Sequence, residues 1–142
     1  MEWRGMGDKG EIMNFLIEVD EKQLQVISVA CDVYARLQCG HLSVALDHCK
    51  NAKGSSFVIP WDAIMTIEAI AKPFMNLELN AHYGIGKFDT ADISWDIHQV
   101  ARKCLHDLKH KESEIYSYST HGHEPMKFGS STLAKITIRE DD

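Results

Sequence analysis

ISWDIHQVARKCLHDLKH, residues 93–110, carries the clearest helical pattern in the chain. Its apolar residues recur at the period of 3.6 residues that marks one face of an α-helix. The pattern predicts a helix that buries this face and begins after an N-cap at Asp89 or Thr90. The positions expected to face inward are Ile93, Ile97, Val100, Ala101, Cys104, Leu105 and Leu108.

Toward the N-terminus, residues 21–40 (EKQLQVISVACDVYARLQCG) predict another long helix. Asp20 suits its N-cap, Gln23 stands at the capping-box position, and Gly40 suits the residue after the helix. Three valines widen the apolar stripe, so we expect this helix to be buried on most sides. The stripe consists of Leu24, Ile27, Cys31 and Tyr34.

Two further helices are expected between these. Residues 41–51 (HLSVALDHCKN) form a short amphipathic segment. In the next helix Pro60 suits the first turn, and Pro73 should kink or end it. Its apolar stripe consists of Ile64, Ile67, Ala71 and Phe74.

Two segments near the ends of the chain alternate in the manner of β-strands. Phe15, Ile17 and Val19 share one side of an early segment, and a late segment, TLAKITI, has a similar alternation. The predicted fold class is therefore α+β. It is mainly helical, with about four helices and a small antiparallel sheet formed by the N- and C-terminal strands. Residues 1–12 read as an N-terminal extension and residues 13–142 as a single compact domain.

Composition excludes several classes of protein. The 142 residues carry a formal net charge of −6, which argues against general binding to nucleic acid. No apolar run approaches the ~20 residues of a membrane span. The four cysteines form no C-x-x-C pair. We expect a cytoplasmic protein without a cofactor.

The opening stretch also places three polar side chains in a row. His98, Arg102 and His106 are four residues apart, so they share one side of the helix, away from its apolar face. A solvated face is the simplest interpretation, since basic residues near a helix C-terminus complement its dipole. An anion site built on Arg102 with either histidine is a second interpretation. A metal site is a third, and it needs ligands from other elements.

Aromatic residues add a possible stacking surface. Trp95 lies off the apolar face of the helix, and Tyr83 lies in the preceding loop, HYGIGKF. Aromatic rings near arginine and histidine can stack on nucleobases, and they also anchor protein interfaces. The loop lacks the G-x-x-x-x-G-K-[ST] pattern of a phosphate loop. The aromatics outside the apolar stripes are Trp3, Trp61, Tyr83, Trp95, Tyr116 and Tyr118.

A second histidine cluster lies in STHGHEP. His121 and His123 are two residues apart, with Glu124 next to them. Histidines in this spacing can share a metal when the backbone is extended, but no H-E-x-x-H motif supports the site. A polar turn is the simpler interpretation.

Three short motifs resemble small proteins encoded by tailed bacteriophages. They are VYARLQCGHL, WDIHQVARKCL and PMKFGSSTLAKI, within a resemblance that spans about residues 13–138. The family patterns are Y-S-R-I-x-x-G-Q, Y-D-x-Y-Q-V-I-R and P-L-x-x-I. The chain departs from them at His41, Trp95 and His98, which bears on any ligand role of these residues. The matches are Tyr34, Arg36, Gly40, Asp96, Gln99, Val100, Arg102, Leu133 and Ile136.

The resemblance implies a phage accessory protein, a class that often counters host defence by inhibiting a protein or by sequestering a nucleotide immune signal. Our first hypothesis is a non-catalytic homo-oligomeric binding protein, in the host cytoplasm, that sequesters an anionic nucleotide. Arg102, His98 and His106 pair with phosphate, while Trp95 or Tyr83 stacks on a base. Asp96 and Gln99 orient the site or read base edges.

Two alternatives belong to other classes. The first is an inhibitor that binds a host enzyme through the aromatic surface. The second is a metal-dependent enzyme that uses His121 and His123 with a carboxylate. No sequence motif for a catalytic nucleophile is present, so we expect a protein that is not an enzyme.

Overall fold

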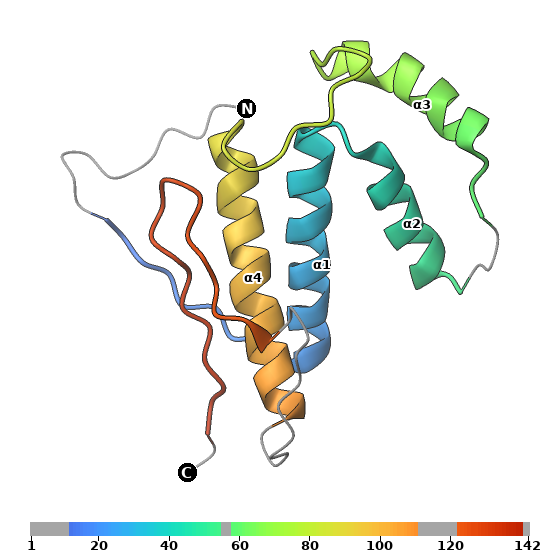
Figure 1. Cartoon of the computed structure of the whole chain (residues 1–142). Helices are drawn as coiled ribbons and strands as arrows, with labels where there is room; N and C mark the ends of the chain where they lie inside the picture. Colours follow the sequence, from blue (N-terminus) through green and yellow to red (C-terminus); the bar gives the residue numbers. More distant parts are fainter. Residues whose placement is uncertain (1–11, 55–57, 111–121, 141–142) are drawn as a thin grey trace.

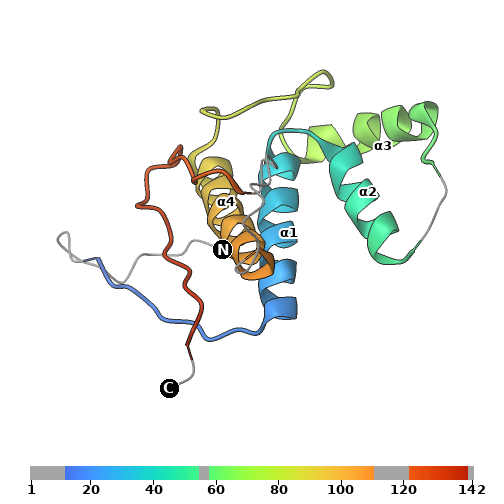
Figure 2. The same ribbon diagram turned by 60° about the horizontal axis from the view of Figure 1, so that its bottom comes forward.

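A computed structural model describes residues 12–54, 58–110 and 122–140. Helices α1 and α4 lie side by side, and α2 and α3 extend to one side of this pair (Figure 1, Figure 2). The mainly helical prediction, with about four helices, is confirmed. In the described residues no helix has the length and apolar character of a membrane span. The helices are α1 (Glu21–Gln38), α2 (Leu42–Ala52), α3 (Trp61–Phe74) and α4 (Asp89–Lys109).

The predicted antiparallel sheet is wrong, because the described residues contain no strand. Residues 12–19 and 132–140 are irregular in backbone conformation, and no backbone ladder joins them among the described residues. They meet at an exposed ion pair between Arg139 Nη1 and Glu18 Oε1, 2.7 Å apart. A two-residue period indicates which face a strand would bury, but it supplies no partner edge.

The contact between α1 and α4 is made largely by small and polar side chains. The buried stripe of α1 consists of Ser28, Asp32 and Ala35, and the C-cap residue Cys39 is buried as well. Small side chains let two helices pack at short distance, and Ser94 Oγ donates to Cys31 O at 2.7 Å across this contact.

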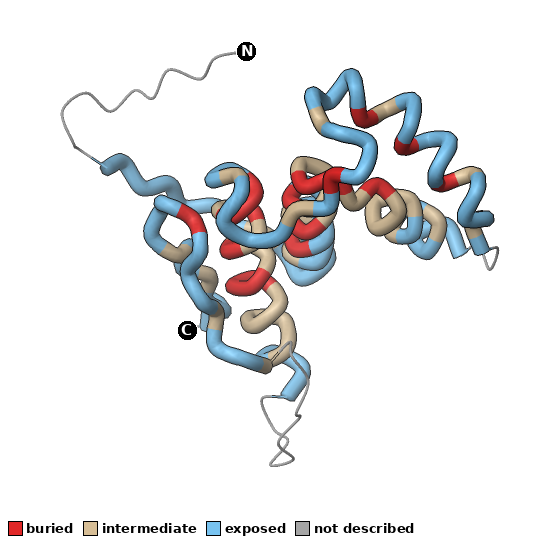
Figure 3. Tube along the Cα trace, turned by 45° about the horizontal axis from the view of Figure 1, so that its top comes forward, coloured by how far each residue is buried: buried red, intermediate tan, exposed pale blue. Residues whose placement is uncertain are grey.

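The expectation that α1 is buried on most sides is wrong. Val26 is 68% exposed and Tyr34 is 55% exposed, and the buried residues are confined to one side of the helix (Figure 3). On α4 the predicted inward face is partly confirmed. Val100 and Ala101 are buried, whereas Leu108 near the end of the helix is exposed.

The ends of α1 follow the sequence prediction. Asp20 Oδ1 accepts from Gln23 N, and Gln23 Oε1 accepts from Asp20 N, both at 2.8 Å. Gly40 follows the helix with φ at +88°. The start of α4 differs from the prediction. Asp89 is the first helical residue rather than the cap, and its carboxylate accepts from the backbone and hydroxyl of Ser130 instead.

Helix α3 buries a largely polar stripe and exposes much of its apolar surface. Lys72 is fully buried, with Nζ donating to Leu79 O and Ala81 O, each at 2.9 Å. The helix ends at Phe74, directly after Pro73, as predicted. The predicted apolar stripe is only partly buried. Ile64 is buried, but Ile67 is 39% exposed and Phe74 is 91% exposed.

Candidate functional site

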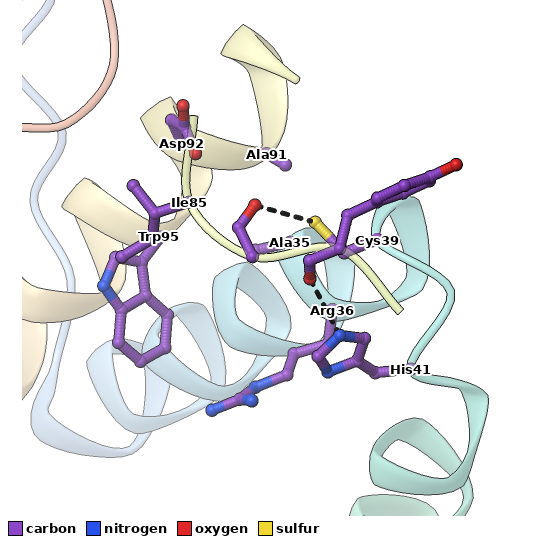
Figure 4. A pocket seen from close by; sticks show the side chains of 10 residues that line it. Ala35, Arg36, Cys39, His41, Ile85, Ala91, Asp92 and Trp95 are labelled. Atoms are coloured by element: carbon purple, nitrogen blue, oxygen red, sulfur yellow. Dashed lines mark hydrogen bonds between the residues drawn. The ribbon is translucent and has the colours of Figure 1, made fainter. Parts of the chain in front are cut away.

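A cavity of about 260 Å³ lies between the end of α1, residues 83–85 and the first turns of α4 (Figure 4). Its wall is mostly apolar. Arg36 comes from α1 and Cys39 from its C-cap, Tyr83 from the loop, and Asp92 and Trp95 from α4. Three separate parts of the chain therefore build one concave site, which is the usual form of a small-molecule site.

The loop is fixed to the end of α1 by a close backbone approach. An added Cβ at Gly40 would lie 2.1 Å from Ala81 O, so a glycine is needed at this position. Tyr83 N donates to Cys39 O at 2.8 Å. His41 Nε2 donates to Tyr83 O at 2.8 Å, since a carbonyl oxygen can only accept.

The far end of the loop is fixed to α4. The carboxylate of Asp92 accepts from Gly86 N, at 3.1 Å to Oδ1 and 3.0 Å to Oδ2. This acidic side chain therefore has a structural partner at the edge of the cavity. Burial raises the pKa of the Cys39 thiol, and the nearby Asp92 charge adds to this, so Cys39 stays a thiol at neutral pH.

Two guanidinium groups lie over the Trp95 ring. Arg36 Cζ and Arg102 Cζ are each 5.3 Å from the ring centroid. Arg36 Nε donates to Asp32 Oδ1 at 3.0 Å, and Arg36 is also one of the residues that line the cavity. Burial lowers the pKa of Arg102 from its ordinary value, but an arginine remains charged at neutral pH.

The Asp32 carboxylate contacts two basic side chains, Arg36 and His48. It is buried, with Arg36 on one oxygen and His48 Nε2 on the other, each at 3.0 Å. His48 lies on α2, so a single carboxylate links α1 to its neighbour and orients an arginine at the cavity. With Asp92 at the edge of the cavity, the two arginines and two aspartates around Trp95 have no net formal charge.

His98 has a structural contact that the sequence did not predict. Its Nδ1 lies 2.8 Å from Ser28 O and 3.0 Å from Ser28 Oγ. The carbonyl accepts, so Nδ1 carries the proton, and this nitrogen cannot act as a base toward the Ser28 hydroxyl. Burial lowers the pKa of His98, so the imidazole is neutral at pH 7 and lacks the charge expected of a phosphate ligand.

Asp96 and Gln99 are occupied on another side of α4. Asp96 accepts from the backbone N–H of Phe128 at 3.0 Å and of Gly129 at 2.8 Å. Gln99 exchanges two hydrogen bonds with the backbone of Met126. Both side chains are buried, and neither lines the cavity. Their predicted role in a ligand site thus receives no support from their position.

His106 lies apart from the cavity, three turns beyond the residues of α4 that line it. Its ring stacks on His110 at 4.4 Å between centroids. Its Nε2 is buried and has no hydrogen-bond partner among the described residues. The predicted row of His98, Arg102 and His106 is therefore divided, and Arg102 is the member that carries charge beside Trp95.

Tyr83, which was proposed from the sequence as a stacking residue, lines the cavity. It packs edge-to-face on Phe88 with centroids 5.7 Å apart, and Lys87 Nζ lies 4.7 Å from its ring centroid.

Three residues at or beside the cavity were absent from the predicted site, namely Arg36, Asp32 and His41. A weak signal existed, since Arg36 lies in one of the three motifs that resemble phage proteins, but its position beside Trp95 depends on how α1 packs on α4.

No group of three or more metal-binding side chains occurs among the described residues. His123 is exposed, and His121 lies outside the described residues.

Comparison with known proteins found no matching family model, no matching curated protein and no matching solved structure. The resemblance to phage proteins therefore remains a prediction.

Proposed function

We propose that the chain binds a small anionic nucleotide in the cavity beside Trp95, without chemical turnover. The observation that carries the proposal is a mostly apolar cavity with an arginine in its wall and a second guanidinium over the same indole. An apolar wall with aromatic rings suits a base, and a guanidinium suits a phosphate.

The size of the cavity narrows the ligand class. A volume of about 260 Å³ lies just below the ~300–1,000 Å³ typical of sites for small molecules. It suits one nucleoside unit with its phosphate at the mouth. A larger signal, such as a cyclic dinucleotide, can place one unit inside and leave the other in solvent.

The residues proposed here to bind the nucleotide differ from those proposed from the sequence. Arg36 supplies the charge in the cavity wall, Tyr83 supplies an aromatic wall, and Arg102, which is not a lining residue, adds a second cation over Trp95. Because two guanidinium groups already lie over the Trp95 ring, this indole supports the arginines more directly than it supports a stacked base. Sequestration of a host defence signal by a phage accessory protein is the biological role that fits such binding.

A protein partner is the second candidate. Trp61 is 70% exposed and Phe15 is 81% exposed, and exposed aromatics of this kind anchor protein interfaces. Trp95 and Tyr83 are half-buried, which reduces the aromatic surface expected from the sequence. Trp3, Tyr116 and Tyr118 lie outside the described residues.

The test is calorimetric titration of the full chain with nucleoside monophosphates, ADP-ribose, cyclic dinucleotides and the matching uncharged nucleosides. We expect a nucleotide to bind more tightly than its nucleoside. Arg36→Ala should weaken nucleotide binding about 10- to 100-fold, the range expected for a charge-assisted hydrogen bond. The matched control is Arg139→Ala, which removes an exposed arginine of the C-terminal segment.

Chromatography of the recovered nucleotide checks the absence of turnover. An unchanged nucleotide supports the binding function, whereas a product rejects it. If no nucleotide binds, or if Arg36→Ala binds as tightly as the wild type, the proposal is wrong and a search for a protein partner comes next.

A further inference from the structure

The outward side of α3 carries an apolar seam of coiled-coil type. Ala63, Ile67, Ile70 and Phe74 follow one another at spacings of four, three and four residues. This is the spacing of a and d positions, which keeps apolar side chains on one line along a helix. Ile70 is 63% exposed and Phe74 is 91% exposed, so the upper part of the seam lies in solvent.

The opposite side of α3 already has its contacts within the chain. Ile64, Glu68 and Lys72 are buried there, and Lys72 binds the carbonyls that precede the cavity loop. The buried positions of α3 lie along one side of the helix (Figure 3). Among the described residues, the seam is thus the more exposed face of a helix whose other side is buried.

The seam is self-complementary about a twofold axis. An axis midway between Ile67 and Ile70 places Ile67 opposite Ile70 of an antiparallel second helix. The same axis places Ala63, the smallest side chain of the seam, opposite Phe74, the largest. Small against large is the arrangement that lets facing side chains interdigitate, and an isologous interface requires this reciprocity.

We propose that α3 packs antiparallel on α3 of a second copy of this chain. The seam carries no charged residue, and antiparallel helices place opposite dipole ends together. The exposed seam side chains offer on the order of 400 Å² per chain, compared with about 800 Å² per partner in a stable complex. The expected product is a dimer that dissociates on dilution in the micromolar range. This inference does not depend on the proposed function.

The first experiment is sedimentation equilibrium of the full chain across about 1–200 μM, the range in which a small interface dissociates. We expect dimers at the upper end and monomers for Ile70→Glu. The matched control is Met65→Glu, which places the same charge on an exposed position of α3 outside the seam, 53% exposed. A wild type that stays monomeric, or an Ile70→Glu variant that associates like the wild type, overturns the proposal.

Disulfide trapping tests the orientation. In a Cys49→Ser background, which removes the exposed cysteine, Ala63→Cys and Phe74→Cys variants are mixed and oxidised. Antiparallel pairing predicts a cross-link between the two different variants and little cross-linking within either one alone. A cross-link between two Ala63→Cys chains indicates parallel pairing and overturns the proposal. The proposal is also overturned if the chain is monomeric and oxidation yields no intermolecular disulfide. That result would mean that the chain itself covers the seam.

Discussion

At the residue scale, Gly40 lets the end of α1 approach the backbone of Ala81, just before the loop that lines the cavity. It has φ at +88°, and an added Cβ would lie 2.1 Å from Ala81 O. Gly40→Ala should therefore reduce the free energy of unfolding by more than about 2 kcal/mol, because backbone strain and a backbone clash add.

Gly54→Ala is the matched control for Gly40→Ala. Gly54 also has positive φ, at +70°, but nothing lies within 4 Å of its added Cβ. It should cost about 1 kcal/mol from strain alone. Denaturant unfolding measures both values, and equal effects would show that the contact with Ala81 is unimportant.

A second prediction at the residue scale concerns the stability of a Lys72 variant. Lys72→Met keeps most of the buried volume but leaves the carbonyls of Leu79 and Ala81, together with the Glu68 carboxylate, without their cation. Loss of one partner of a buried pair costs about 3–5 kcal/mol. Thermal unfolding should show a large decrease in stability, whereas Lys53→Met, at an exposed lysine, should show little change.

Single residues were predictable from the sequence where their role is local. The capping box of Asp20 and Gln23 and the glycine after α1 depend on neighbours within a few positions. Arg36 and Asp32 were not predictable in this way. Their importance arises because α1 presents them beside Trp95, and no pattern within α1 indicates which side meets α4.

At the element scale, the C-terminal segment is held to α4 by side-chain acceptors rather than by a strand. Asp96→Asn replaces an oxygen that accepts from Phe128 and Gly129 with an amide that donates. Backbone amides of residues 126–130 should then exchange with deuterium at least about tenfold faster, as expected for a loss of more than 1 kcal/mol. Amides of α1 should be unaffected.

The matched control is Asp107→Asn, which changes a half-exposed carboxylate of α4 that pairs with Lys103. Mass spectrometry of deuterium uptake distinguishes the two variants. If Asp96→Asn leaves exchange in residues 126–130 unchanged, the carboxylate does not hold the segment.

The helices themselves were predictable because each has its own period and end signals. Their burial was not. α1 buries Ser28 and Asp32 while Val26 lies in solvent, the reverse of what an apolar stripe predicts. Similarly, the alternation of residues 15–19 suggested a strand, but pairing depends on a second edge that the segment itself does not specify.

At the scale of the whole molecule, two partly buried histidines make stability depend on pH. Burial lowers the pKa of His98 and of His41 below the ordinary value of 6.5. Above 6.5 both states are neutral at these residues, so their contacts keep their full strength. As pH falls, the unfolded chain takes up protons first, and stability is lost progressively until the pH is below the folded pKa.

The same argument predicts the effect of removing one of these histidines. His98→Asn retains an N–H near the position of Nδ1, which can donate to Ser28 O, but it no longer titrates. Between about pH 7.5 and pH 5, the wild type should lose more unfolding free energy than His98→Asn, since other titrating groups are common to both. Urea unfolding at several pH values measures the difference. Its absence would mean that the pKa of His98 is the same in the folded and unfolded states, so that the charge of Asp32 and the hydrogen bond to Ser28 offset burial and the charges of Arg36 and Arg102.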